Sequence, residues 1–527
     1  MTPAPAKTIK MQLNGAEVEA PEGQNLIEVC RGRGIVVPHF CYHPGLKVDG
    51  NCRMCLVEIE GMPKPQVACA TPAREGLKIH TDTPKVLEVR RAVLEFLLVN
   101  HPIDCPICDQ AGECYLQNYY MLHGKYESRL EGDKVEKRKV VDLGAQVVLD
   151  TERCVLCTRC VRFFRDVTGR EELYIKNRGD HSEITTFPGR DLESAYSGNV
   201  VDICPVGALT SKDFRFKCRV WYLKTVDSVC PGCARGCSTF VDHAQNEIQR
   251  LRPRHNAAVN GWWMCDAGRM GYHEVRQGRL LGGWLAGHGE VAARHALDET
   301  ARILAGATPA DVGFVASPDL PTEAMFALAR FAALFGGARV AGGSLRAPWV
   351  EDGILRKADR HPNSKALEIL GLAGGLAEML ARPPRVLVVS EEDLAGDGGE
   401  AALAALARVE SLLVLSSRRT PTVEMARAAL PIPTYAEIDG TFVNFAGRLQ
   451  RFHRAINPLG EARAVPALLA ELAARLGKEI GWTPATATPA ALWPAIAEAV
   501  PAFSGVRFDA IPADGFALDP AREAIAR

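Results

Sequence analysis

The chain has 527 residues, of which 47% are apolar and 24% are charged, and its formal net charge is -1. This length exceeds a single hydrophobic core and predicts roughly three to five domains. The near-zero net charge offers no broad attraction for nucleic acid or lipid headgroups, so a nucleic-acid partner is disfavoured.

The amino terminus, the apolar runs and the cysteines predict the cellular compartment of the chain. The amino terminus lacks an apolar run long enough for an export signal, which predicts a cytoplasmic chain. The best apolar run, residues 92–99, contains Glu95 and is far shorter than the roughly 18 residues of a membrane span. In a reducing compartment the 17 cysteines are expected to bind metal rather than to form disulfides.

The first segment predicts a hairpin and a helix. Residues 8–19 alternate around Asn14-Gly15, a pair that tolerates the positive φ of a two-residue turn. Asn25 and Glu28 have the spacing of a helix start, and Cys30 lies on the expected buried side as a core thiol. A loop and an alternating strand, residues 56–60, come next.

Fifteen cysteines and one histidine fall into four groups, each with a C-x2-C pair and more distant partners. Thiolates at this spacing suit zinc, or iron with sulfide. In chain order the groups are Cys41, Cys52, Cys55 and Cys69; His101, Cys105, Cys108 and Cys114; Cys154, Cys157, Cys160 and Cys204; and Cys230, Cys233, Cys237 and Cys265.

The first group has the spacing C-x10-C-x2-C-x13-C and comes after the predicted hairpin and helix. This arrangement resembles the β-grasp [2Fe-2S] ferredoxin domain at the start of the large iron–sulfur subunits of respiratory complex I. A zinc-binding loop is the alternative, although structural zinc sites more often use two short pairs.

The second group follows a predicted helix that starts at Pro84 and stops at residues 100–102. Its spacing, H-x3-C-x2-C-x5-C, resembles the [4Fe-4S] site with one histidine ligand that complex I shares with iron-only hydrogenases. His101 is either a neutral ligand that raises the reduction potential or a cap on the helix dipole. The helix has an expected apolar stripe of Val86, Val89, Val93, Phe96 and Leu97.

The third group follows a densely charged stretch, residues 123–140, which predicts a solvated connector. It opens as C-x2-C-x2-C and resembles half of a bacterial two-cluster ferredoxin. Phe164 and Val200 stand where the second cluster would have ligands, so one cluster is expected. Four nearby arginines either neutralise the site or form a solvated helical face: Arg153, Arg159, Arg162 and Arg165.

The fourth group, C-x2-C-x3-C-x27-C, resembles the [4Fe-4S] domain at the front of molybdopterin oxidoreductases. A zinc knuckle is the alternative. Residues 217–223 before it alternate and predict a strand in which Cys218 packs. Trp262, Trp263 and Met264 precede the last ligand and are interpreted as domain core that incidentally shields the site from water.

After Cys265 the chain contains no cysteine. Strands are predicted over 311–317, 385–390 and 411–416, and helices over 322–335, 400–409 and 423–430, which indicates an open parallel α/β domain. Neither G-x-G-x-x-G after a strand nor G-x-x-x-x-G-K-S/T occurs to support a nucleotide site. Residues 437–450 resemble a segment of the molybdopterin oxidoreductase fold, and 483–489 predicts a linker before a short tail.

The four groups together resemble the large iron–sulfur subunits of complex I, NADH:quinone oxidoreductase. The resemblance implies one [2Fe-2S] and three [4Fe-4S] clusters, no molybdopterin and no substrate site in the chain itself. It implies electron relay from an NADH-oxidising flavoprotein subunit toward quinone, coupled to proton translocation by the complex. Other peripheral-arm partners, indirect membrane association and the cytoplasmic side of the bacterial inner membrane are implied by the same resemblance.

The resemblance also implies a multi-domain α+β and α/β fold. The expected domains are a β-grasp [2Fe-2S] ferredoxin-like domain (1–84), a histidine-plus-cysteine-ligated [4Fe-4S] domain (85–124), a ferredoxin-like [4Fe-4S] domain (140–216), a molybdopterin-oxidoreductase-type [4Fe-4S] domain (223–280) and a shortened molybdopterin-oxidoreductase-like α/β domain without pterin (281–527).

Three other functions fit part of the sequence. The catalytic subunit of a molybdopterin NAD-dependent formate dehydrogenase has similar first domains, but it needs two ferredoxin-type clusters, a longer pterin domain and a cysteine or selenocysteine for the metal. An iron-only hydrogenase would require several cysteines in its C-terminal half. A zinc scaffold without redox activity would require zinc sites with unusually long, asymmetric spacings.

Overall fold

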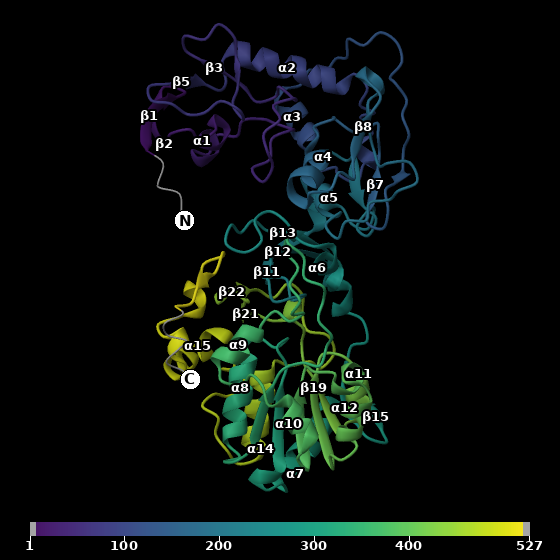
Figure 1. The fold of residues 1–527 in the computed structure, drawn as a ribbon, viewed down its shortest axis with the longest axis vertical. Helices are drawn as coiled ribbons and strands as arrows, with labels where there is room; N and C mark the ends of the chain where they lie inside the picture. The colour runs from purple at the N-terminus through teal and green to yellow at the C-terminus, as the bar shows by residue number, and fades with distance from the viewer. Residues whose placement is uncertain (1–6, 520–527) are drawn as a thin grey trace. The chain divides into compact units, whose positions relative to one another are not determined.

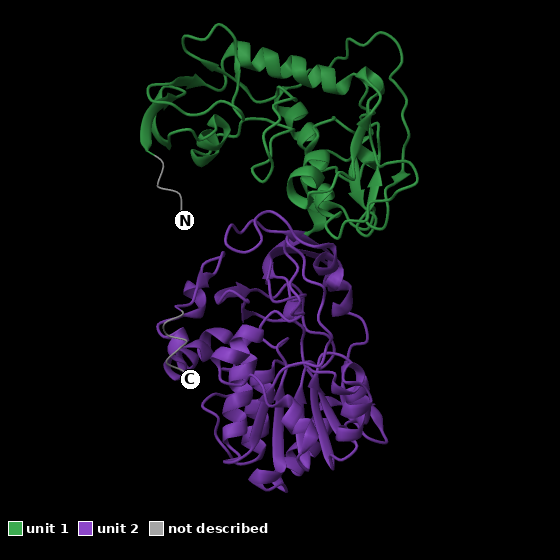
Figure 2. Cartoon of the chain, in the orientation of Figure 1, with its two compact units in different colours: residues 1–223 green, residues 224–527 purple. Residues whose placement is uncertain are grey.

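The computed structural model describes residues 7–519, and the chain divides into two compact units between Leu223 and Lys224 (Figure 1, Figure 2). Each sheet lies wholly within one unit. The first unit combines small sheets and helices, and the second contains a mostly parallel sheet, so the expected multi-domain α+β and α/β fold is confirmed. Within residues 7–519, no helix has the length and apolar character needed to span a bilayer.

The first unit begins with a five-stranded sheet in the order β2-β1-β5-β3-β4. Its elements are β1 (Thr8–Leu13), β2 (Ala16–Pro21), α1 (Leu26–Gly32), β3 (Leu56–Ile59), β4 (Gln66–Val67) and β5 (Lys78–His80). The predicted hairpin is present, with Asn14 and Gly15 at φ values of 51° and 85° in the turn. The buried side of this sheet packs on α1, where Cys30 is fully buried as predicted.

Helix α2 (Pro84–Leu98) begins at the predicted proline, and the Thr83 side chain caps it by accepting a hydrogen bond from the Val86 amide. The predicted apolar stripe is wrong in one respect, because Phe96 is 80% exposed. The buried residues are Val86, Arg90 and Leu94, which are spaced four residues apart and therefore share one face of the helix.

The rest of the first unit consists of short elements around long loops. They are α3 (Tyr115–His123), β6 (Val141–Asp142), β7 (Val147–Leu149), α4 (Arg159–Phe163), β8 (Tyr174–Lys176), β9 (Glu183–Thr185), α5 (Asn199–Ile203) and β10 (Leu209–Ser211). Residues 124–140 have no helix or strand, as expected of the charged connector.

The strand predicted over 217–223 is wrong. Residues Val220–Tyr222 form a 3-10 turn, and the strand β11 (Lys224–Val229) begins only where β12 (Ser238–Ala244) provides a partner. Trp221 and Tyr222 are largely exposed, and Cys218 is half-buried. Alternation alone does not make a strand when no neighbouring strand is available for hydrogen bonding.

The second unit starts with a three-stranded antiparallel sheet, β11-β12-β13, and then a short helix. Strand β13 spans Glu247–Pro253 and helix α6 spans Asp266–Met270. The fourth cysteine group lies at the ends of these elements, because Cys230 follows β11, Cys237 precedes β12 and Cys265 precedes α6.

A seven-stranded sheet in the order β15-β14-β20-β19-β18-β16-β17 forms the body of the second unit. The strands are β14 (Gly283–Leu285), β15 (Gly289–Val291), β16 (Val312–Ala316), β17 (Arg339–Gly342), β18 (Val386–Ser390), β19 (Ser411–Ser416) and β20 (Ala428–Pro431). The five neighbouring strands β20, β19, β18, β16 and β17 run parallel to one another. At one edge of the sheet, β14 pairs antiparallel with β20, and β15 pairs antiparallel with β14. The predicted open parallel α/β domain is present.

Helices cover both faces of this sheet (Figure 1). One face packs on α7 (Ala293–Ala305), α8 (Thr322–Ala333), α9 (Ser364–Ile369), α14 (Val465–Arg475) and α15 (Pro489–Ala499). The other packs on α10 (Leu376–Ala381), α11 (Leu394–Asp397), α12 (Gly399–Leu406) and α13 (Pro421–Met425). Burial on both faces explains the continuous apolar runs of the parallel strands.

The helix predicted over 423–430 is half wrong. Helix α13 ends at Met425, and residues 428–431 form strand β20, whose Ala428 and Leu430 pair with Leu413 and Leu415 of β19. Alanine favours helices in isolation, but a place in a buried parallel ladder outweighs that preference here.

Residues 483–488 contain no helix or strand, as expected of the predicted linker, but the segment after them is not the predicted short tail. The Thr488 side chain caps α15, and Trp493 of that helix is fully buried. The Trp493 indole donates a hydrogen bond of 2.7 Å to Glu323 of α8. Strand β23 (Phe516–Ala517) then pairs with β22 (Arg448–Phe452), next to β21 (Gly440–Val443). The tail is therefore part of the core.

Candidate metal centres

The first group lies on the loop between α1 and β3 and just after β4. Cys41, Cys55 and Cys69 are buried, and Cys52 is half-buried. Hydrogen bonds from the thiols of Cys52 and Cys69 lower the pKa of Cys41, and a bond from Cys69 lowers the pKa of Cys55. The Cys41 sulfur thus lies within hydrogen-bond reach of Cys52 and Cys69, and Cys69 also reaches Cys55, although Cys41 and Cys69 are far apart in sequence.

The second group lines one cavity of about 240 Å³. His101, Cys105, Cys108 and Cys114 all contribute to its wall. Burial lowers the pKa of His101 to about 4, so the imidazole is neutral at pH 7 and has a free lone pair for a metal. The structure therefore brings the histidine and its three cysteines together.

Lys134, rather than His101, caps the carboxyl end of helix α2. The ammonium group of Lys134 donates to the carbonyl of Leu98 at 2.8 Å and to the carbonyl of His101 itself at 2.6 Å. The alternative role of His101, neutralising the helix dipole, is thus filled by a residue of the charged connector. The imidazole faces the cysteine-lined cavity instead.

The third group lines a small cavity, where Cys154, Cys157, Cys160 and Cys204 lie beside apolar side chains such as Leu149 and Ile184. Burial raises the pKa of the Cys154 and Cys204 thiols to about 12. The Leu156 amide donates to the Cys154 sulfur at 3.4 Å, and Leu156 has a left-handed φ of 50°. Amide donors of this kind stabilise a thiolate ligand.

Three of the four arginines noted beside this group are buried rather than solvated. Arg153, Arg159 and Arg162 are 5%, 4% and 3% exposed, whereas the Arg165 side chain is 51% exposed and pairs with Asp166. Arg153 forms a two-pronged ion pair with Asp104, with distances of 3.0 and 2.5 Å. Asp104 immediately precedes Cys105, so this pair joins the loops of the second and third groups.

The fourth group lines a small cavity in the second unit. Cys230, Cys233, Cys237 and Cys265 share its wall with Met264, Trp349 and Leu355. The Gly268 amide donates to the Cys265 sulfur at 3.3 Å. Of the three residues expected to shield the site, only Met264 lines the cavity; Trp263 is buried, and the Trp262 ring stacks on His255 with centroids 4.0 Å apart.

Two glycines that sequence reasoning missed make room for the sulfur atoms. A Cβ on Gly207 would lie 2.3 Å from the Cys108 sulfur, and one on Gly268 would lie 2.9 Å from the Cys230 sulfur. Gly207 follows Cys204-Pro205 of the third group, so a glycine after that pair was a signal in the sequence. Trp349 and Leu355 gave no such signal, because they reach the fourth cavity from a distant segment.

The donor sets fit an inorganic core larger than one ion. Among residues 7–519, no group of three or more His, Cys, Asp or Glu side chains converges closely enough to hold a single metal ion. In three of the four groups, all four ligand residues instead line one shared cavity. Thiolates spread around such a space match the donor chemistry of iron and sulfide.

A further cavity lies at the carboxyl ends of the parallel strands in the second unit. It measures about 160 Å³, and Asp319, Glu391 and Arg418 line it just after β16, β18 and β19. It also shares Gly232, Gly268 and Trp349 with the fourth cysteine cavity. Ligands of open α/β sheets commonly bind at this edge.

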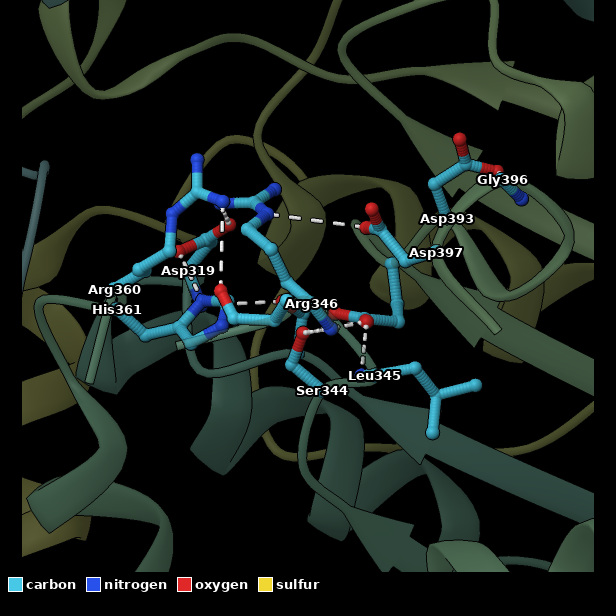
Figure 3. A network of polar contacts seen from close by, with 12 residues as sticks. Asp319, Ser344, Leu345, Arg346, Arg360, His361, Asp393, Gly396 and Asp397 are labelled. Carbon is cyan, nitrogen blue, oxygen red and sulfur yellow. Dashed lines mark hydrogen bonds and ion pairs between the residues drawn. The ribbon is translucent and has the colours of Figure 1, made fainter. Parts of the chain in front are cut away.

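Several charged side chains around this cavity are paired with one another. Arg346 contacts Asp319 at 3.3 Å and Asp397 at 3.8 Å, and His361 bonds to Asp319 at 2.8 Å (Figure 3). Arg418 pairs with Glu274 at 3.2 Å. Two of the three arginines that line this cavity, Arg346 and Arg418, are thus engaged by carboxylates, whereas the third, Arg360, lies over the Trp349 ring with its guanidinium 5.0 Å from the ring centroid.

Family models match successive parts of the chain. They describe a 2Fe-2S iron-sulfur cluster binding domain (6–84), the NADH-ubiquinone oxidoreductase-G iron-sulfur binding region (90–129), the ferredoxin-like domain of NADH-quinone oxidoreductase subunit 3 (144–210), the molybdopterin oxidoreductase Fe4S4 domain (223–277) and molybdopterin oxidoreductase (383–475). These matches indicate a chain built from 2Fe-2S and 4Fe-4S binding domains followed by a part similar to molybdopterin oxidoreductases.

Relatives narrow this class. The G subunit of the NADH-quinone oxidoreductase of Rickettsia felis is 42% identical over 61% of this chain and 48% of its own length. The mitochondrial NADH dehydrogenase [ubiquinone] iron-sulfur protein 1 of Solanum tuberosum is 42% identical over 62% and 45%, respectively. Over the matched residues the chain is similar to the large iron–sulfur subunits, G or 75 kDa, of NADH-quinone oxidoreductase. It spans about half the length of these relatives.

A solved structure also resembles part of the chain. It is an NAD+-reducing [NiFe]-hydrogenase in the H2-reduced state, with 33% identity and a TM-score of 0.37. The match covers 40% of this chain and 91% of the hydrogenase chain.

Proposed function

We propose that the chain relays single electrons within an NADH:quinone oxidoreductase, from an NADH-oxidising flavoprotein subunit toward quinone. The observation that carries the proposal is the gathering of each of the four ligand groups at one place, three of them around sulfur-lined cavities. Proton translocation would be a property of the whole complex.

The proposed cofactors are one [2Fe-2S] cluster and three [4Fe-4S] clusters. The [2Fe-2S] cluster is assigned to Cys41, Cys52, Cys55 and Cys69. The [4Fe-4S] clusters are assigned to His101, Cys105, Cys108 and Cys114; to Cys154, Cys157, Cys160 and Cys204; and to Cys230, Cys233, Cys237 and Cys265. When bound, such clusters accept and release one electron at a time.

The residues of the chain hold and tune these centres rather than convert a substrate. With four protein ligands, each iron core has no open position for a reactant, so we assign no catalytic residue. Backbone amides directed at Cys154 and Cys265 stabilise negative charge on sulfur, and neutral His101 replaces one anionic ligand. Apolar walls keep water away from the third and fourth centres.

The proposed partners are the NADH-binding flavoprotein subunit and other subunits of the peripheral arm. The names of the relatives, all of them subunits of NADH dehydrogenases, support this assignment. We place the chain on the cytoplasmic side of the bacterial inner membrane, held there through partners, with no nucleic-acid ligand.

We also propose that the cavity at the strand ends holds no pterin. The engagement of Arg346 by Asp319 and of Arg418 by Glu274 supports this view, as does the lack of any cysteine after Cys265 in the sequence. Molybdenum or tungsten in the purified protein would contradict it and would favour a dehydrogenase with its own substrate site.

Anaerobic analysis of iron, acid-labile sulfide and zinc tests the proposal on the purified chain. We expect about 14 iron atoms per chain, from one two-iron and three four-iron clusters. EPR spectra after reduction should show the corresponding signals. A folded, colourless protein with stoichiometric zinc and no sulfide would instead establish a zinc scaffold.

A further inference from the structure

Arg162 contacts the ligand loops of two different centres. Its guanidinium donates one hydrogen bond to the carbonyl of Cys41, in the first group. It donates another, of 3.3 Å, to the carbonyl of Cys157, in the third group. It also donates to the carbonyl of Lys47 and, through Nε, to the Thr158 hydroxyl at 3.0 Å. One buried side chain thus joins two loops that are more than 100 residues apart.

Neighbouring contacts reinforce this junction. The Thr158 hydroxyl donates to the Asp49 carboxylate at 2.6 Å, and the side-chain amide of Asn51 donates to the Leu156 carbonyl at 3.4 Å. Arg159 donates to the carbonyls of Tyr42, at 2.5 Å, and Ile203, at 3.0 Å. Tyr42 follows Cys41 and Ile203 precedes Cys204, so Arg159 also links the first and third groups.

The charge of Arg162 is less compensated than that of Arg153. Arg153 holds Asp104 in a two-pronged ion pair and has Asp150 at 3.4 Å, so carboxylates cancel its charge. The hydrogen bonds of Arg162 go to neutral oxygens, and the carboxylate it pairs with, Asp49, is 3.9 Å away and partly exposed. The positive charge of Arg162 lies at the backbone of a ligand from each group, because its guanidinium donates to the carbonyl oxygens of both Cys41 and Cys157.

We propose that Arg162 is a shared positioning residue for the first and third centres, whose buried positive charge raises the reduction potential of both. A cluster gains one negative charge on reduction, and a nearby buried cation stabilises that reduced state. Because one side chain acts on both centres, both potentials move in the same direction. The proposal rests on the proposed function, since it requires clusters at both groups.

The experiment is an anaerobic redox titration of the full chain, monitored by EPR. We expect Arg162→Gln to lower both potentials, with at least a tenfold loss in each one-electron reduction constant, or about 59 mV. The fold should persist because Arg159 still links the loops. Arg162→Lys should restore both potentials to within about threefold of the wild-type constants, because it retains the charge that a merely structural role would not need.

Two variants serve as controls. Arg165→Gln, in the same segment but exposed and paired with Asp166, should leave both potentials unchanged. Asp49→Asn removes the negative charge nearest to Arg162 and should raise both potentials. Asp49→Asn decides the matter if Arg162→Gln fails to assemble its clusters.

Some outcomes overturn the proposal. Arg162 does not act on both centres if Arg162→Gln keeps its clusters but shifts only one potential, or neither. The same conclusion follows if neither potential rises in Asp49→Asn. Iron and sulfide analysis of the wild-type chain separates this failure from a failure of the proposed function, because absent clusters would be seen there first.

Discussion

His101 illustrates how a single side chain sets the character of a centre. Its imidazole is neutral and lines the same cavity as Cys105, Cys108 and Cys114, while Lys134 neutralises the end of α2. A neutral nitrogen in place of a thiolate leaves the iron core with less negative charge. Such a centre is easier to reduce than its all-cysteine counterparts.

The variant His101→Cys should therefore keep its cluster but lower the reduction potential of the second centre. We expect at least a tenfold loss in the one-electron reduction constant, or about 59 mV, in an EPR-monitored titration. His123→Cys, at the end of α3 and outside the cavity wall, is the matched control and should change nothing. An unaltered potential in His101→Cys would argue that the imidazole does not bind iron.

Gly207 provides a steric test at the same centre. A methyl group at this position would lie 2.3 Å from the Cys108 sulfur, so Gly207→Ala should displace that ligand. We expect the loss of the second-centre EPR signal and of about four iron atoms per chain. Gly32→Ala, where nothing lies within 4 Å of the added methyl, should keep the full iron content. Full iron in Gly207→Ala would mean that the backbone shifts easily.

The ligand groups could be predicted from the sequence because short pairs such as Cys105 and Cys108 are local. The contacts around them could not. Arg162 reaches the carbonyl of Cys41 across 121 residues, and Gly207 approaches Cys108 from another loop. No spacing rule encodes such encounters. The assignment of each ligand to iron remains a prediction until the metal analysis is made.

At the scale of elements, helix α8 connects three parts of the second unit through one acid. Glu323 on α8 accepts hydrogen bonds from the amide and hydroxyl of Thr441 on β21, at 3.1 and 3.0 Å, and from Trp493 on α15, at 2.7 Å. Burial raises the pKa of Glu323 to about 7. The carboxyl group is therefore protonated in the folded protein under conditions in which it ionises in the unfolded chain.

This shift predicts a pH-dependent stability. Between the ordinary pKa of Glu323, 4.5, and its folded pKa of about 7, the folded state holds the proton more tightly, so stability falls as pH rises. From pH 6 to pH 8 the loss should be about 1 kcal/mol, measured as urea midpoints by circular dichroism. Glu323→Gln should abolish this component, whereas the exposed Glu378→Gln should retain it. Equal pH slopes in all three proteins would contradict the assignment.

The elements that were predicted correctly are those in which local pattern and tertiary context agree. Pro84 starts α2, Asn14 and Gly15 form a hairpin turn, and residues 411–416 form a buried strand. Residues 428–431 and 489–499 differ from the prediction because their tertiary contacts, rather than their local sequence, determine their structure. The first segment completes a parallel ladder next to β19, and the second buries Trp493 against α8. A window of sequence contains neither partner.

At the scale of the whole molecule, the centres are divided unequally between the units. The first three ligand groups lie before Leu223 and the fourth after it. A reductive titration should take up about four electrons per chain, one for each cluster. Cys230→Ser should remove about one electron while leaving the EPR signals of the first three centres unchanged. Loss of all signals in this variant would show that the centres assemble as one cooperative set.

The joint between Leu223 and Lys224 interrupts no strand pairing, because each sheet is complete on its own side. A gene rearrangement at this point would therefore preserve every hydrogen-bonded ladder on both sides. Rearrangement within the first 223 residues would break contacts between ligand loops, since Arg153, Arg159 and Arg162 connect those loops to one another. Evolution can exchange the segment after the joint more freely than the three-centre block before it.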